Sequence, residues 1–210
     1  THCESSAASD VYKRQLMNNN NFNPLDKFRC DGSFQFGDRI FGCWYTKGHG
    51  EIDLSSAISL SCDIYFYRTI QFYELDDLAS YFNLFGFGKM TGIDIGKEYK
   101  GTIPNTDYMN DRYGPSGWSK GSLLNFCIGQ GEILVTPIQV FNYTNLLATR
   151  GSTKSPHFVS TIKSHQQNDL NISSKIWDRI ENDMRQVVSN LKGTGKNADP
   201  GIVNSDIYGK

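Results

Sequence analysis

Helical spacing of apolar residues begins at Asp53 and continues, with two short breaks, through the next thirty or so positions. Asp53 can cap a first helix that ends near Ile58, because a carboxylate accepts hydrogen bonds from the free N–H groups of a first turn. A second helical pattern follows Ser61-Cys62-Asp63, and a third covers residues 76–85. The spacing therefore predicts three consecutive short helices, the last of them ended by Gly86.

Residues 86–131 have little periodicity and many glycine and aromatic residues, so we expect a long irregular connection. A connection of this length in a compact domain is unusual and is often functional. The start of a helix follows it, because Thr136, Pro137 and Gln139 have the order of an N-cap, a first helical residue and a capping-box partner. We expect this helix to continue to the residue before Gly151.

The remaining segments predict strands and one more helix. Apolar and polar residues alternate on both sides of Gly37-Asp38, which indicates a hairpin or an extended loop within residues 28–44. Residues 157–162 have strand character, and residues 174–189 form an amphipathic helical pattern. The sequence shows no internal repeat and no second domain, so we expect residues 16–210 to be one partial domain.

Charge and hydropathy exclude several classes of protein. The formal net charge of −1 leaves no basic face for nucleic acid, so we expect no nucleic-acid partner. No run of residues approaches the roughly 18 apolar residues needed to cross a bilayer.

Residues 5–15, SSAASDVYKRQ, match the translation of a common sequencing adaptor, and we interpret residues 1–15 as non-biological. On this interpretation Cys3 belongs to no site and the natural sequence begins near Leu16.

Taken singly, the candidate functional residues carry little specificity. Ser61-Cys62-Asp63 lies at a break between helical patterns, where side chains can point into a cleft, but a serine beside an acidic residue there is more often a cap. Gly129-Gln130-Gly131 is a glycine-flanked turn, and Lys210 alone would be an ordinary surface lysine. Trp44 and Tyr45 are expected in the core or in a cleft wall. The order of these features along the chain is more informative than any one of them.

Four segments in order resemble landmarks of the class B penicillin-binding proteins: SCDIYFY at 61–67, FGFGKMTGIDI at 85–95, IGQGEILVTPIQV at 128–140 and GTGKNA at 193–198. The resemblance is closest to the elongation-specific branch, penicillin-binding protein 2, and covers essentially all of residues 16–210. It implies an α/β fold of the penicillin-binding protein and serine β-lactamase type, in which a helical lobe flanks an antiparallel sheet. Of that fold, this incomplete chain would hold mainly the helical lobe.

The family uses three motifs, S-x-x-K, S-D-N and K-T-G. No S-x-x-K occurs between Leu16 and the expected hairpin, so the nucleophilic serine and its activating lysine are expected upstream. Ser61 and Asp63 match the second motif, and aspartate in place of asparagine is typical of penicillin-binding protein 2. By resemblance, Ser61 would relay a proton to the leaving amine and Asp63 would bond the lysine of the first motif. Lys210 would be the lysine of the third motif, and we expect the isolated fragment to be inert.

Cys30, Cys43, His49 and Cys62 follow a C-x12-C-x5-H-x12-C spacing. Three cysteines and a histidine are a common tetrahedral zinc set, although this spacing lacks the usual close pair. By resemblance, His49 and Cys62 match ligands of a structural zinc found in some relatives, and Cys30 and Cys43 stand where those relatives have carboxylates. A Cys30–Cys43 disulfide and buried free thiols are the alternatives to zinc. Cys127 is expected to be a small core residue on a buried strand, and no organic cofactor is expected.

The resemblance implies that the parent protein is a D,D-transpeptidase, in which an acyl-serine formed from a D-Ala-D-Ala stem peptide is attacked by the amine of a neighbouring strand. Peptidoglycan stem peptides, β-lactams and a polytopic membrane glycan polymerase would be its partners. The parent would be anchored in the bacterial inner membrane, with this domain in the periplasm. Two other classes stay open: a β-lactamase or β-lactam sensor on the same fold, and a non-catalytic, zinc-stabilised binding module.

Overall fold

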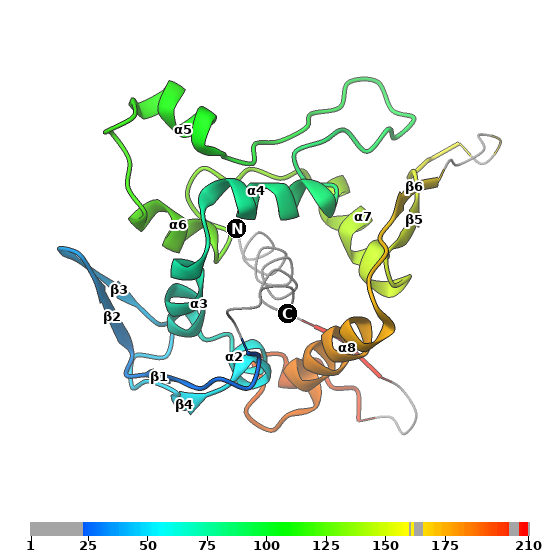
Figure 1. Cartoon of the computed structure of the whole chain (residues 1–210). Coiled ribbons are helices and arrows are strands. Elements are labelled where there is room, and N and C mark those ends of the chain that lie inside the picture. Colours follow the sequence, from blue (N-terminus) through cyan, green and yellow to red (C-terminus); the bar gives the residue numbers. More distant parts are fainter. Residues whose placement is uncertain (1–22, 160, 162–165, 202–205, 210) are drawn as a thin grey trace.

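The computed structural model describes residues 23–159, 161, 166–201 and 206–209 (Figure 1). Helices supply most of the regular structure, and the strands are short and antiparallel. In chain order the elements are β1 (Phe28–Cys30), β2 (Ser33–Phe36), β3 (Arg39–Gly42), β4 (Gly50–Ile52), α2 (Leu54–Ser59), α3 (Asp63–Thr69), η1 (Ile70–Phe72), α4 (Leu75–Leu84), α5 (Thr106–Tyr113), α6 (Gly121–Phe126), α7 (Pro137–Ala148), β5 (Ser152–Lys154), β6 (Gln166–Asp169), α8 (Ser174–Ser189) and η2 (Lys196–Ala198). This mixed composition, with helices predominating, is the one expected of an incomplete α/β domain.

The three helices expected after Asp53 are confirmed as α2, α3 and α4. α2 begins where predicted, because the Asp53 carboxylate accepts a hydrogen bond from Ser56 N at 2.9 Å. The N-terminus of α4 is capped by Asp77, whose carboxylate accepts a hydrogen bond from Glu74 N at 3.3 Å. The last predicted helix is also confirmed, since α8 has the expected bounds. Side chains that cap the first turn therefore mark the starts of α2 and α4.

α7 begins as its sequence predicts. Thr136 Oγ1 accepts from Gln139 N at 3.3 Å, and Gln139 Oε1 accepts from Thr136 N at 2.9 Å, so both members of the capping box are satisfied. The Gln139 amide also donates to Lys89 O and to Lys100 O, at 2.7 and 2.9 Å. Because Gln139 is only 2% exposed, these bonds anchor the loop between α4 and α5 on the first turn of α7.

The described strands form three separate antiparallel pairs. β2 and β3 pair with Phe36 opposite Arg39, which confirms the hairpin expected around Gly37-Asp38. β1 pairs with β4, and β5 pairs with β6. In Figure 1 the β2–β3 and β5–β6 hairpins project from opposite sides of the helical part.

The prediction of a strand over residues 157–162 is wrong: the residues of this range that the structure describes do not form one. Residues 157–159 lie after β5 and have no strand conformation; residues 160 and 162 are outside the described part. Phe158 N and Val159 N both donate to the Asp94 carboxylate at 2.7 Å. In a strand, these two N–H groups could donate to a neighbouring strand. Here both donate to Asp94, which lies in the loop before α5.

The connection expected to be irregular over residues 86–131 contains two helices, α5 and α6. Both are short, and α5 is largely polar, so neither gives an apolar period in the sequence. Asn105 caps α5 by accepting from Tyr108 N at 2.9 Å. α6 ends at Phe126, and Cys127 follows as its C-cap, so the strand expected at Cys127 is wrong. Cys127 is fully buried, as expected for a core residue.

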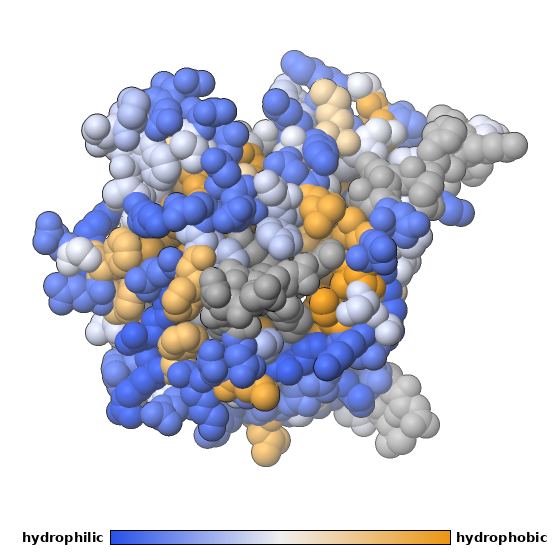
Figure 2. All heavy atoms as spheres, viewed as in Figure 1, coloured by the Kyte–Doolittle hydropathy of each residue, from blue (hydrophilic) through white to orange (hydrophobic). Residues whose placement is uncertain are grey.

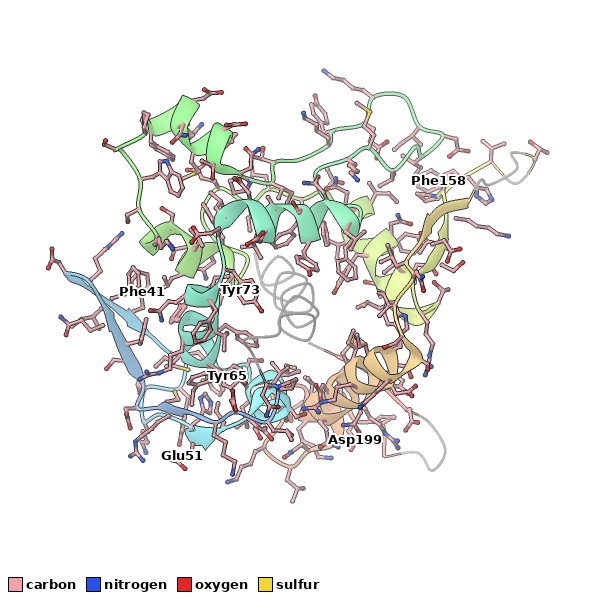
Figure 3. The ribbon with its side chains drawn as sticks, viewed as in Figure 1. Phe41, Glu51, Tyr65, Tyr73, Phe158 and Asp199 are labelled. Atoms are coloured by element: carbon pink, nitrogen blue, oxygen red, sulfur yellow. The ribbon has the colours of Figure 1, made fainter. Side chains whose placement is uncertain are left out.

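α8 packs along α2 and brings a buried carboxylate into their interface (Figure 1). Asp183 has no exposed surface; it accepts from Ser55 Oγ at 2.5 Å and from Arg179 Nε at 3.2 Å. A buried charge costs several kcal/mol unless it is paired and hydrogen-bonded, so these bonds fix how α8 sits on α2. In Figure 3, Tyr65 lies between α3 and this helix pair; its ring meets Phe28 of β1 edge-on, with centroids 5.3 Å apart.

The surface carries both polar and apolar regions. Figure 2 shows hydrophobic side chains near α3 and near α7 on either side of the centre of this face, and polar residues along α8. Within the described part of the chain, no helix combines the length and apolar composition that crossing a membrane requires.

Gln139→Met should lower the free energy of unfolding by about 2–4 kcal/mol, because it leaves Thr136 N and two loop carbonyls without their buried partner. The measurement is urea unfolding of the full-length protein. Gln35→Met, at an exposed position of the β2–β3 hairpin, is the matched control and should change stability by less than about 0.5 kcal/mol. Equal stability of the two variants would show that Gln139 does not hold this loop.

Candidate active site and metal centre

α2 and α3 meet at a tight turn that contains Ser61. Cys62 N donates to Ala57 O at 2.9 Å and Ser61 N donates to Ile58 O at 3.2 Å, the two bonds of a Schellman motif. Ser61 has a φ of 50°, in the left-handed region that this motif requires and that glycine usually fills. A side chain costs about 1–2 kcal/mol in this conformation. Such strain in a folded protein often marks a functional position.

Ser61 and Asp63 are each bonded to a segment that is distant in the sequence. The Thr194 hydroxyl, in the loop after α8, lies 3.0 Å from Ser61 Oγ, and Thr194 N donates to Ser59 O at 3.1 Å. On the other flank, Trp44 N donates to Asp63 Oδ2 at 2.9 Å. The sequence marks Thr194 only as part of the GTGKNA landmark and gives it no role. Its contact with Ser61 depends on how α8 packs, which no local pattern encodes.

The structure tests the prediction made for Trp44 and Tyr45 but not the one made for Lys210. Lys210 lies outside the described residues, so its place in the third motif stays a prediction. Trp44 and Tyr45 are 58% and 40% exposed, so neither is a core residue. The Trp44 indole N–H donates to Leu60 O at 2.9 Å, immediately before Ser61. The Trp44 ring is therefore held at the surface beside the second motif.

Cys30, Cys43, His49 and Cys62 converge next to the α2–α3 turn. Three sulfur atoms and one ring nitrogen, one from each side chain, all lie within 4.8 Å of one another. His49 Nδ1 is 3.6 Å from the sulfur of Cys30 and 3.6 Å from that of Cys43. The three cysteines are buried and His49 is half-buried. None of the four cysteines in the described residues forms a disulfide, so the Cys30–Cys43 bridge is not formed in this structure.

Short backbone turns bring these side chains together. Cys30 ends β1, His49 precedes β4, and these two strands pair with Cys30 opposite Gly50. Cys43 follows β3, and Gly48 lies against the backbone of Cys30 with a φ of 78°. A Cβ atom on Gly48 would lie 2.3 Å from Cys30 O, so only glycine permits this approach. The GHG segment thus places His49 beside both cysteines.

Hydrogen bonds inside the cluster favour a thiolate at Cys43. The Cys62 thiol donates to the Cys43 sulfur, and the N–H groups of Tyr45 and Asp63 also bond it. These bonds, with the nearby His49, outweigh burial and lower the pKa of Cys43 to about 4. The same contact, followed by burial, raises the pKa of Cys62 well above its ordinary value. A thiolate is the form of cysteine that binds a metal.

The donor set and its spacing fit a tetrahedral zinc ion. Zn–S and Zn–N bonds of about 2.3 and 2.0 Å at tetrahedral angles place sulfur and nitrogen about 3.6 Å apart, the separation found at His49. Three cysteines and one histidine would fill every coordination position, as in structural zinc sites. Such an ion would stabilise the fold here and would leave no position for a reactive water.

Ser61→Gly should give a protein that is more stable than Ser61→Ala by about 1 kcal/mol. Both variants lose the hydroxyl, and only alanine keeps a Cβ atom in the left-handed conformation. Urea unfolding of the two full-length variants measures the difference, and Ser80→Gly, at an exposed position within α4, should show the opposite sign relative to Ser80→Ala. If Ser61→Ala were the more stable of its pair, Ser61 would not have a left-handed backbone.

Comparisons with known proteins identify the family of this chain. Residues 15–210 match the family described as penicillin binding protein transpeptidase domain. Peptidoglycan D,D-transpeptidase MrdA of Haemophilus influenzae is 33% identical over 168 residues, which are 75% of this chain and 26% of the relative. The PBP2 in a complex with MreC from Helicobacter pylori has a TM-score of 0.85 and 30% identity, covering 94% of this chain and 37% of that one. Pseudomonas aeruginosa PBP2 in complex with WCK 5153 has a TM-score of 0.81 and 28% identity, covering 93% and 44%.

These matches confirm the fold that the resemblance implies. The chain spans about a quarter of the length of the Haemophilus relative. The matched residues include the α2–α3 turn with Ser61 and Asp63 and the loop with Thr194. This chain belongs to the penicillin-binding protein transpeptidase domain family.

Proposed function

We propose that the full-length protein containing this chain is a peptidoglycan D,D-transpeptidase, which crosslinks stem peptides through an acyl-serine and is acylated by penicillin. The observation that carries the proposal is the left-handed turn that presents Ser61 and Asp63 together, in the order of the family's second motif. The Haemophilus relative is named for this activity. The nucleophilic serine and its lysine would come from sequence that precedes this segment in the full-length protein.

Ser61 would act as the proton relay of acylation. The nucleophilic serine would lose its proton to the lysine of the first motif as it attacks the stem-peptide carbonyl. As the C–N bond breaks, the Ser61 hydroxyl would pass its proton to the leaving amine, and that lysine would return a proton to Ser61. A proton relay works only from within hydrogen-bonding reach of the reacting group, so the hydroxyl needs a fixed direction. The tight turn fixes the Cα–Cβ bond of Ser61, and the Thr194 hydroxyl lies 3.0 Å from its oxygen.

Asp63 and Lys210 would act on the charges of the site. Asp63, whose carboxylate accepts from Trp44 N, would bond the lysine of the first motif and hold it near the nucleophile. Lys210 would be the lysine of the third motif, where its positive charge attracts the C-terminal carboxylate of the stem peptide.

We propose that Cys30, Cys43, His49 and Cys62 hold a structural zinc ion. Trp44 follows Cys43 directly, and Cys62 lies between Ser61 and Asp63 in the chain. An ion bound to these cysteines would therefore link the hairpin segment to the second motif and limit its movement. The four-ligand geometry and the lowered pKa of Cys43 support this role.

The proposed cellular setting follows from the family. Peptidoglycan stem peptides are the proposed substrates, β-lactams the proposed inhibitors, and a polytopic membrane glycan polymerase the proposed partner. The Helicobacter relative was solved in a complex with MreC, so a protein of that kind is a further candidate partner. We place the full-length protein at the bacterial inner membrane with this domain in the periplasm.

Fluorescent penicillin should label the full-length protein covalently, and Ser61→Ala should slow labelling by about 10²-fold or more, because a general acid–base group contributes about 10²–10⁴-fold. Ser80→Ala, at an exposed position of α4, is the matched control and should label at the wild-type rate. A wild-type protein that folds but takes no label would contradict the proposed activity. Rapid release of the label would favour the β-lactamase alternative instead.

The purified full-length protein should contain about one equivalent of zinc. Cys43→Ser should reduce the zinc content below half an equivalent and lower the Tm by about 5–10 °C, since each kcal/mol shifts Tm by roughly 2–4 °C in a domain of this size. Cys127→Ala replaces a buried cysteine outside the cluster and should keep the zinc. Zinc below half an equivalent in the wild type, with a Cys30–Cys43 disulfide found by mass spectrometry, would refute the proposed structural zinc site.

A further inference from the structure

We infer that Thr194 is a positioning residue for the reaction, holding the Ser61 hydroxyl in the direction that proton transfer needs. This inference rests on the proposed function, because it assigns a role to Thr194 only through Ser61. It goes beyond the three motifs, since Thr194 lies in the GTGKNA segment after α8 and belongs to none of them.

The Thr194 hydroxyl lies between two oxygens of the α2–α3 turn. Its oxygen is 3.0 Å from Ser61 Oγ and 3.5 Å from Ser59 O, so the shorter and stronger contact is with Ser61. Thr194 N donates to Ser59 O at 3.1 Å, which fixes the backbone of Thr194 against the end of α2. The backbone bond from Thr194 to Ser59 therefore supports the side-chain contact between Thr194 and Ser61.

The loop that carries Thr194 is bound tightly to the end of α8. Gly195 N donates to Val187 O at 3.0 Å and Gly193 N donates to Asn190 O at 2.9 Å. A Cβ atom on Gly193 would lie 2.2 Å from Val187 O, so only glycine lets the chain pass this close to the helix. These bonds satisfy carbonyl groups that the end of a helix leaves without partners. The glycine before Thr194 thus has a structural reason.

α2 and α8 are also joined directly beside this loop. Ser59 Oγ donates to Gln186 O at 3.2 Å, one residue before the carbonyl that binds Gly195. Together with the bonds to Val187 O and Asn190 O, this contact makes the end of α2, the end of α8 and the Gly-Thr-Gly loop one connected unit. Thr194 is exposed at its edge, where its side chain meets Ser61.

A hydroxyl group with a free torsion spends only part of its time in the direction that a proton transfer requires. A hydrogen bond from a fixed neighbour restricts the Ser61 side chain to one rotamer, and hydroxyls of serine and threonine can each donate and accept. When Thr194 donates to Ser61 Oγ, this bond does not use the Ser61 proton, which the proposed relay passes to the leaving amine. Loss of the Thr194 hydroxyl should therefore slow acylation and leave the fold intact.

The test compares acylation rates of the full-length protein with fluorescent penicillin. Thr194→Val keeps the size of the side chain and removes the hydroxyl; it should slow acylation about tenfold, the effect of losing one neutral hydrogen bond. Thr194→Ser restores the hydroxyl and should stay within about twofold of the wild type. Thr144→Val, which removes an exposed hydroxyl on α7, is the control and should acylate at the wild-type rate. All variants should keep the wild-type Tm within about 2 °C.

A double mutant separates positioning from a merely structural effect. If Thr194 acts through Ser61, Thr194→Val should slow the Ser61→Ala protein no further. Additional slowing in that background, wild-type acylation by Thr194→Val, or a failure of Thr194→Ser to restore the rate would each overturn the inference. A wild-type protein that takes no label overturns the proposed function itself, whereas normal labelling of both wild type and Thr194→Val overturns the role of Thr194 alone.

Discussion

The left-handed backbone of Ser61 is the constraint on which the rest of the candidate site depends. It ends α2, starts α3 in a new direction, and sends three consecutive side chains to three different partners. Ser61 meets the loop after α8, Cys62 joins the cysteine–histidine cluster, and Asp63 accepts from Trp44 N. A continuous helix would keep α2 and α3 on one axis, so the change of direction between them depends on this residue.

The strain at this turn is modest beside the interactions that hold it. A serine in the left-handed region costs about 1–2 kcal/mol, and each neutral hydrogen bond at the turn returns about 0.5–1.5 kcal/mol. The two Schellman bonds, the Thr194 contact and the Trp44 bonds involve three segments of the chain. A zinc ion on the neighbouring cluster would add a further link through Cys62. The geometry of the second motif is therefore a product of tertiary structure.

Local signals in the sequence predicted most of the fold, and long-range contacts account for what they missed. Asp53 and the capping box at Thr136 located helix starts correctly, because caps act within one turn. α5 was not predicted because it is short and polar. The strand expected after β5 does not form where the structure describes it, because Asp94, far away in the chain, binds two of its N–H groups. The resemblance indicated Ser61 and Asp63. It marked Thr194 only as part of the GTGKNA landmark, and no local pattern could indicate its contact with Ser61, which arises when α8 packs on α2.

The most direct test of the account is a crystal structure of the full-length protein acylated by a β-lactam. The account predicts Ser61 with a positive φ, its hydroxyl within about 3 Å of Thr194 Oγ1 and facing the acylated serine, with Asp63 beside the lysine of the first motif. Ser61 in a right-handed conformation, or an acyl group bound away from the α2–α3 turn, would contradict it.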